Sequence, residues 1–246
     1  THGHSVSASG IFYKSAPYSV GPDGRLDYGK IRGHVRAHKP KVVIAGYTAY
    51  PRDIDWKEFR SVCDEVGAYL MADIAHIAGL VAGGVLENPV VLADVVTTTT
   101  HKTLRGARGG LILTNRQDVF EKVQKAVFPG LQGGPLAHLV AAKAVALGEA
   151  LKPSFKDYAA QVVKNAKALA EVLSEGGAKL VTGGTDNHLM VVDVRPFGID
   201  GKAAETALAA CRVVCNKNTV PDETGSAFKP SGVRIGTPAL TTRGLK

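Results

Sequence analysis

Short apolar runs alternate with amphipathic stretches in the first half of the chain. Four short runs, at 41–46, 69–75, 95–100 and 110–114, are typical of buried strands, and the first of them is rich in β-branched residues. Residues 56–66 repeat apolar side chains at intervals of three or four, which predicts a helix. Strands separated by helices indicate an α/β fold with a mainly parallel sheet. The short glycine-rich link between the last two runs predicts a local reversal, so the sheet should be mixed.

Two consecutive helices are expected in the middle of the chain. The first is rich in Ala and covers residues 135–151. After Pro153, Ser154 and Asp157 form a capping-box pattern, which predicts the start of the second helix. Gly176-Gly177 is expected to end it. Its predicted apolar face consists of Phe155, Tyr158, Val162, Leu169 and Leu173.

The pattern of apolar and polar residues changes in the last third of the chain. Strands are expected at residues 188–194 and 232–237, with a helix at 201–211. We therefore predict a large domain over residues 1–153 and a smaller α+β domain over residues 154–246.

Composition and charge narrow the classes of protein to which the chain could belong. The 246 residues carry a net charge of +8, but the densest basic group, residues 32–41, has no interleaved aromatic residues. A solvated basic face is therefore favoured over nucleic-acid binding. No apolar run reaches the ~18 residues of a membrane-spanning helix. The three cysteines, Cys63, Cys211 and Cys215, form no CxxC pair, which indicates a reducing, cytoplasmic compartment and no metal site.

Polar side chains follow three of the predicted strands, where ligands bind in open α/β sheets. Thr48 follows the first strand, Asp73 and His76 end the second, and His101 and Lys102 follow the third. Taken singly, each has a structural explanation, as a turn cap, a core histidine or a surface lysine. Taken together, they place an amine and a carboxylate at one edge of the sheet.

This combination suits the chemistry of pyridoxal 5'-phosphate (PLP). A sheltered lysine such as Lys102 can form an imine through its neutral amine. An anion such as Asp73 keeps the pyridine nitrogen protonated, so that the ring accepts electrons. The Thr48 hydroxyl and the His76 imidazole are candidates to orient the phenolic oxygen of the cofactor.

Two further features fit a cofactor and its substrate. The glycine-rich loops at 105–110 and 128–135 expose backbone N–H groups that suit phosphate, although ordinary turns have the same composition. Arg234 lies in a predicted strand, where an arginine needs an anionic partner. That partner is either a carboxylate of the protein or the carboxylate of a substrate.

The block VVTTTTHKTLRGARGG (residues 95–110) resembles the lysine signature of the serine hydroxymethyltransferase family. The resemblance continues through MADIAHIAGLVAGG, FPGLQGGP, GGTDNHLMVVDV, CNKNTVPDE and SGVRIGTPALTTRG, and covers essentially the whole chain. It implies a three-layer, aspartate aminotransferase-like PLP enzyme of fold type I, active as a homodimer or homotetramer with shared active sites. The implied reaction interconverts serine and glycine and passes a one-carbon unit to tetrahydrofolate.

The resemblance also implies a role for each matching residue. Catalysis would involve Lys102, which binds the cofactor covalently, with His101 and Thr99 beside it. Gly133 and Gly134 would approach the phosphate of the neighbouring subunit's cofactor. The other implied cofactor-binding residues are Asp73, His76, Thr48 and Arg108, and the implied substrate-binding residues are Arg234 for the carboxylate and Asn218 and Phe228 for the folate.

The chain departs from the family pattern in several places. Ala107 stands where the family usually has proline, and Thr48 where it often has serine, which keeps the hydroxyl. Family members are much longer, and the chain starts without an initiator Met, as expected of a fragment or a processed product. An amino-terminal phosphate loop, a ring-stacking imidazole and a partner-subunit tyrosine and glutamate would lie outside it. The chain alone is therefore not expected to hold a complete active site.

Two alternative functions stay open. A PLP enzyme similar to threonine aldolase would act without folate, but the resemblance places CNKNTVPDE at the folate site. An inactive fragment would act as a binding module, for example for RNA through its basic surface.

Overall fold

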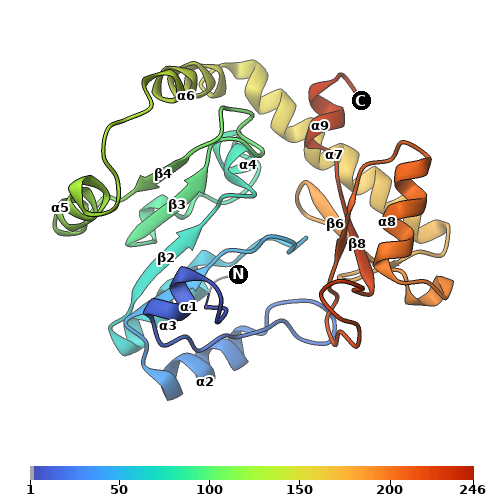
Figure 1. Ribbon diagram of the computed structural model, residues 1–246, viewed down its shortest axis with the longest axis horizontal. Coiled ribbons are helices and arrows are strands. Elements are labelled where there is room, and N and C mark those ends of the chain that lie inside the picture. The colour runs from blue at the N-terminus through green and yellow to red at the C-terminus, as the bar shows by residue number, and fades with distance from the viewer. Residues whose placement is uncertain (1–2) are drawn as a thin grey trace.

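The computed structural model describes residues 3–246, and this part of the chain forms two four-stranded sheets connected through a long helix (Figure 1). The first sheet has the order β1-β2-β3-β4. Strands β1 (Val42–Ala45), β2 (Tyr69–Asp73) and β3 (Val95–Thr99) are parallel, and β4 (Gly110–Leu113) pairs antiparallel with β3. The predicted α/β fold with a mainly parallel, mixed sheet is confirmed. The observed strands are one or two residues shorter at their ends than predicted.

Helix α3 (Trp56–Val66) has the predicted bounds, and its sequence explains both ends. The Asp55 side chain accepts a hydrogen bond from the Glu58 N–H at 3.0 Å, which satisfies a backbone donor of the first turn. Gly67 ends the helix in the left-handed conformation with a φ of 68°. The apolar stripe of α3, which includes Trp56 and Phe59, is buried in the first hydrophobic core.

The second sheet is antiparallel throughout and has the order β5-β6-β8-β7. Strands β6 (Leu189–Asp193) and β8 (Gly232–Gly236) correspond to the two predicted ones. Strands β5 (Lys179–Leu180) and β7 (Asn216–Asn218) are too short to give a periodic signal. Helix α8 (Gly201–Ala210), predicted at 201–211, contacts β7 and β8.

Helix α7 (Pro153–Glu175) contributes to both hydrophobic cores. Phe155, Tyr158 and Val162 pack in the first core, whereas Ala166 and Ala170 pack in the second. The predicted apolar face of this helix and its end before Gly176-Gly177 are confirmed. Because α7 is common to both cores, the predicted domain boundary near Pro153 stays a prediction.

The predicted capping box at the start of α7 is wrong. Pro153 is the first helical residue, so the capping position falls on Lys152, which makes no side-chain capping hydrogen bond. Proline suits this first position because its missing N–H would have no partner there. Ser154 therefore lies inside the first turn.

Helix α6 (Ala137–Ala150) lies at the outside of the molecule, and none of its residues is buried (Figure 1). It is slightly shorter than the predicted 135–151. The other helices are α1 (Ala8–Phe12), α2 (Tyr28–His38), which packs on α3, α4 (Ala78–Ala82), α5 (Gln117–Lys125) and α9 (Pro238–Thr242), with shorter or irregular turns η1 (Pro89–Val91), η2 (Ala126–Leu131) and η3 (Arg195–Phe197). None of the described helices is long and apolar enough to cross a membrane.

Polar contacts hold the second sheet against the loop that follows β1. Arg52 donates from Nη1 to Asp186 Oδ1 at 2.8 Å and from Nη2 to the Thr182 carbonyl at 2.7 Å. The Asn187 amide donates to the Tyr50 carbonyl at 2.9 Å. These bonds bring the start of β6 next to the carboxyl ends of the first sheet.

Candidate active site

The strand ends of the first sheet bring the predicted polar residues together. Asp73 is the last residue of β2, and its Oδ1 accepts from the Ala75 N–H at 3.0 Å. Thr99 ends β3 and donates its hydroxyl to the Ala75 carbonyl at 3.2 Å, which ties the two strand ends together. Gly46 follows β1 with a φ of 144°, and a Cβ there would collide with the Asp73 carbonyl. The glycine therefore allows the chain after β1 to pass close to Asp73.

Lys102 lies just past β3 in a half-buried position. Burial lowers the pKa of its amine, the carboxylate of Asp73 opposes this effect, and the positive charges of Arg234 and Arg108 lower the pKa further. Since these charges act on the amine, all three groups lie near it. A lowered pKa increases the fraction of neutral amine, which is the nucleophilic form.

Arg234 enters the same site from the second sheet. Its Nη1 donates to the Thr48 carbonyl at 2.7 Å, and its Nε donates to Asn216 Oδ1 at 3.0 Å. No carboxylate among residues 3–246 lies within 4.0 Å of its guanidinium nitrogens. Of the two predicted partners, the structural ion pair is thus absent from the described chain. Thr48 takes part through its backbone carbonyl, and the predicted role of its hydroxyl stays a prediction.

His76 is also at this edge and meets a second imidazole from the other sheet. Its ring stacks on that of His188, with centroids 5.9 Å apart and an interplanar angle of 22°. Burial, followed by the positive charges of Lys102 and Arg234, lowers the pKa of His76 to about 4. The periodicity of the sequence did not single out His188 or Asn216. The only signal for His188 was a histidine directly before an apolar strand.

His101 and Arg108 form a pair next to the lysine. Arg108 Nη1 lies 3.0 Å from His101 Nε2, and because a guanidinium only donates, Nε2 is the acceptor. Burial, then the charges of Arg108 and Lys102, lower the pKa of His101. The acceptor role of Nε2 and the lowered pKa both favour the neutral imidazole.

Four predicted residues lie outside this group. Gly133 and Gly134 are exposed in the link between η2 and α6, with open space where their side chains would be. Asn218 ends β7 and donates its amide to the Thr219 carbonyl at 2.6 Å, while Phe228 is 82% exposed in a loop. No contact within the described chain joins them to Lys102 or His76. Their assignment to another subunit's cofactor or to folate stays a prediction.

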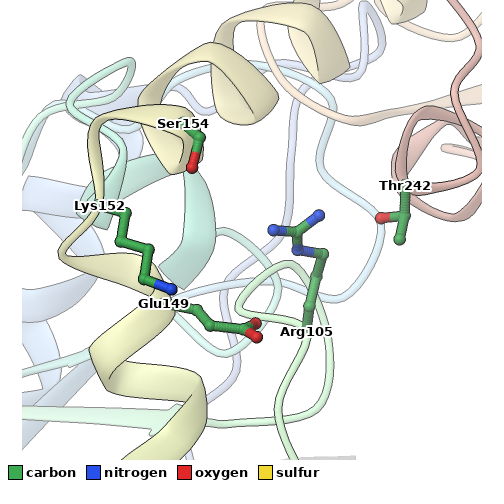
Figure 2. A pocket seen from close by; sticks show the side chains of 5 residues that line it. All are labelled: Arg105, Glu149, Lys152, Ser154 and Thr242. Carbon is green, nitrogen blue, oxygen red and sulfur yellow. The ribbon is translucent and has the colours of Figure 1, made fainter.

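Two hollows mark the surface around these elements. A small cavity of about 10 Å³, roughly the room of one water molecule, lies between the two sheets. A wider hollow of about 450 Å³ lies at the start of α7, where Figure 2 shows charged and hydroxyl side chains around it. Of the residues that line the wider hollow, only Arg105 belongs to a predicted site segment, the glycine-rich loop at 105–110, and neither Lys102 nor Asp73 reaches it. The small cavity is lined by Tyr47, Tyr50, Arg52, Ile54, Asp73, His76, Ile77 and Asn187, and the wider one by Arg105, Glu149, Lys152, Ser154 and Thr242.

An α/β fold with a lysine amine and a carboxylate near each other at the strand ends is typical of the PLP-dependent enzymes of fold type I. The chain belongs to the serine hydroxymethyltransferase family, because the sequence model of that family matches residues 1–246. It is 58% identical to serine hydroxymethyltransferases of Paracoccus denitrificans (strain Pd 1222), Rippkaea orientalis (strain PCC 8801 / RF-1) and Crocosphaera subtropica (strain ATCC 51142 / BH68). Each of these matches covers 100% of this chain and 58% of the relative. The chain thus spans little more than half the length of the curated relatives.

Proposed function

We propose that this chain carries the cofactor-binding lysine of an enzyme that interconverts serine and glycine and transfers a one-carbon unit to tetrahydrofolate. The observation that carries the proposal is the position of Lys102. Its half-buried amine has a lowered pKa and lies near Asp73 at the carboxyl edge of the sheet, in a chain of the serine hydroxymethyltransferase family. No feature of the site favours the folate-independent alternative.

The residues present fit PLP. Lys102 offers an amine for covalent attachment, Asp73 a carboxylate for the pyridinium nitrogen, and His76 a neutral imidazole for the phenolic oxygen. When bound, PLP supplies an electron sink that stabilises negative charge on the α-carbon of an amino acid. Lys102 is positioned to hold the cofactor and to move a proton at its Nζ, with His101 and Thr99 beside it.

Arg234 is the proposed anchor for the substrate carboxylate. Its bonds to Thr48 and Asn216 orient the guanidinium, and no described carboxylate neutralises it. A planar guanidinium binds a carboxylate through two parallel hydrogen bonds, which fixes the amino acid in one orientation. Arg108 positions the loop through its contact with His101.

The remaining assignments extend the proposal to the whole protein. Gly133 and Gly134 would approach the phosphate bound by a neighbouring subunit, and Asn218 and Phe228 would contact the folate. A homodimer or homotetramer is supported by exposed large apolar side chains, which a partner would cover. We assign the protein to the cytoplasm because its three cysteines are all unpaired. The exposed apolar side chains are Phe120, Phe128, Leu131, Leu136, Val140, Val145 and Leu151.

The test uses the full-length gene product, reconstituted with PLP. We expect a visible absorption band that shifts on addition of glycine and disappears in Lys102→Ala. Lys125→Ala, on the exposed helix α5, is the matched control and should keep the band. A lysine-linked band that persists in Lys102→Ala would contradict the proposal. Serine cleavage that is equally fast without tetrahydrofolate would point to the aldolase-like alternative.

A further inference from the structure

His188 is a buried ring at the boundary between the two sheets. It directly precedes β6, is only 6% exposed, and its Nδ1 is buried without a hydrogen-bond partner in the described chain. Its carbonyl accepts from the Thr237 N–H at 3.0 Å, so the pairing of β6 with β8 fixes its backbone. The backbone of His188 is therefore fixed by the second sheet, and its ring faces the first sheet.

The ring of His76 stacks on that of His188. The His76 backbone is held by the Thr103 hydroxyl, which donates to its carbonyl at 3.0 Å. Among the described residues, no hydrogen bond holds the His76 ring itself. The near-parallel stack on His188 is the ring contact that the structure gives for His76.

The surroundings of the pair disfavour a proton on either ring. The charged groups that act on both imidazoles are Lys102, from the loop after β3, and Arg234, on β8. Both are cations, and burial is the larger effect on each ring. The pKa of His76 falls to about 4 and that of His188 to about 3. Both rings are thus neutral near pH 7.

We propose that His188 is a positioning residue of the candidate site, whose ring shields His76 from water and holds it neutral in one plane. A charged His76 would place another cation beside Lys102 and Arg234, and a rotated one would lose its orientation toward the cofactor. This consequence for the cofactor rests on the proposed function. The effect on His76 is a property of the protein alone.

Nuclear magnetic resonance of ring-labelled histidines in the full-length protein without cofactor tests the inference. In the unchanged protein, His76 should titrate far below the usual 6.5. In His188→Ala, water reaches the ring, and we expect the pKa of His76 to rise by about one pH unit or more. His188→Gln, whose polar amide replaces the flat ring against His76, carries the same expectation if the alanine variant does not fold. His188→Phe keeps a flat ring and should leave the pKa of His76 nearly unchanged.

Met190→Ala is the matched control, because Met190 lies two positions further along the chain, in β6, and is fully buried in the second core. Met190→Ala should lower Tm without moving the pKa of His76. A His188 variant would give the same result if the role of His188 were merely structural. An unchanged pKa of His76 in both His188→Ala and His188→Gln would overturn the inference, and so would an equal rise in His188→Phe. A pKa that moves as expected in a protein that never shows the visible PLP band would leave the positioning role standing and refute the proposed function.

Discussion

The guanidinium of Arg234 donates to the backbone carbonyl of Thr48 at 2.7 Å, and this bond connects the two sheets at the candidate site. Arg234 lies in the middle of β8, whereas Thr48 follows β1. Asn216, its partner in register on β7, holds the Nε of the same side chain. The packing of the second sheet on the first therefore determines where the Arg234 guanidinium lies relative to Lys102.

Arg234→Lys should raise KM for the amino acid more than it lowers kcat. A lysine keeps the charge but cannot make two parallel hydrogen bonds to a carboxylate. A charge-assisted bond contributes about 1.5–3 kcal/mol, so KM for serine should rise roughly 10- to 150-fold. Steady-state kinetics of the full-length PLP-loaded protein measure this change. Arg195→Lys, which alters an arginine bound to Asp193 instead, should leave KM unchanged. An unaltered KM in Arg234→Lys would remove Arg234 from the substrate site.

Asp94→Asn should destabilise the first sheet. Asp94 precedes β3, is 8% exposed, and accepts from the Leu70 N–H at 2.7 Å and from Arg60 at 2.8 Å. An uncharged amide removes the buried anion that faces Arg60, which keeps only its ion pair with the exposed Asp64, and loss of a hydrogen bond to a charged group costs about 1.5–3 kcal/mol. Urea unfolding should show a lower midpoint. Asp118→Asn removes an exposed carboxylate that pairs with Arg116 and should leave the midpoint within error. Equal midpoints for the two variants would contradict this account.

Arg52 and Asp186 should be energetically coupled across the two sheets. Their ion pair is 2.8 Å long, with the Arg52 side chain 16% and the Asp186 side chain 40% exposed. Partial exposure limits the expected coupling to about 1 kcal/mol. A double-mutant cycle of Arg52→Gln and Asp186→Asn, followed by urea unfolding, measures it. Strictly additive effects would show that the Thr182 carbonyl, not Asp186, holds this arginine.

Periodicity predicted the elements whose apolar faces are long enough to repeat. The bounds of α3 were correct because its apolar repeat runs from Trp56 to Val66, directly between the capping residues Asp55 and Gly67. The start of α7 was wrong because two local signals compete there. Pro153 fits the first helical position and moves the capping position to Lys152, although Ser154 matches the cap pattern.

The candidate site was predictable only as far as strand ends reveal it. Asp73, His76 and Lys102 follow apolar runs, so their shared edge follows from parallel pairing. His188 and Asn216 belong to the second sheet, and they reach the site only through the way the two sheets pack together. No local pattern encodes that packing.

The two stacked histidines predict an unusual acid sensitivity. Folding lowers the pKa of His76 to about 4 and that of His188 to about 3, against 6.5 for the free side chain. As the pH falls below 6.5, the unfolded chain therefore binds protons that the folded chain does not, and stability decreases. For His188 this loss is at most about 1.4 kcal/mol per pH unit. It is complete only below the folded pKa values.

The pH range in which the histidines reduce stability can be separated from the range in which the carboxylates do so. Burial alone would raise the pKa of Asp193 and of Glu223, but hydrogen bonds, joined by the charge of Arg195 at Asp193, hold both at about 2, below their ordinary values of 3.8 and 4.5. The stability they contribute is present above about pH 4.5 and is lost only as the pH falls toward 2. Urea unfolding between pH 7 and pH 4.5 thus reports mainly on histidines. His188→Phe should flatten the decline in this range, whereas Asp193→Asn should leave its slope unchanged. A slope that is the same with and without His188 would mean that this ring binds its proton equally well in the folded and unfolded protein.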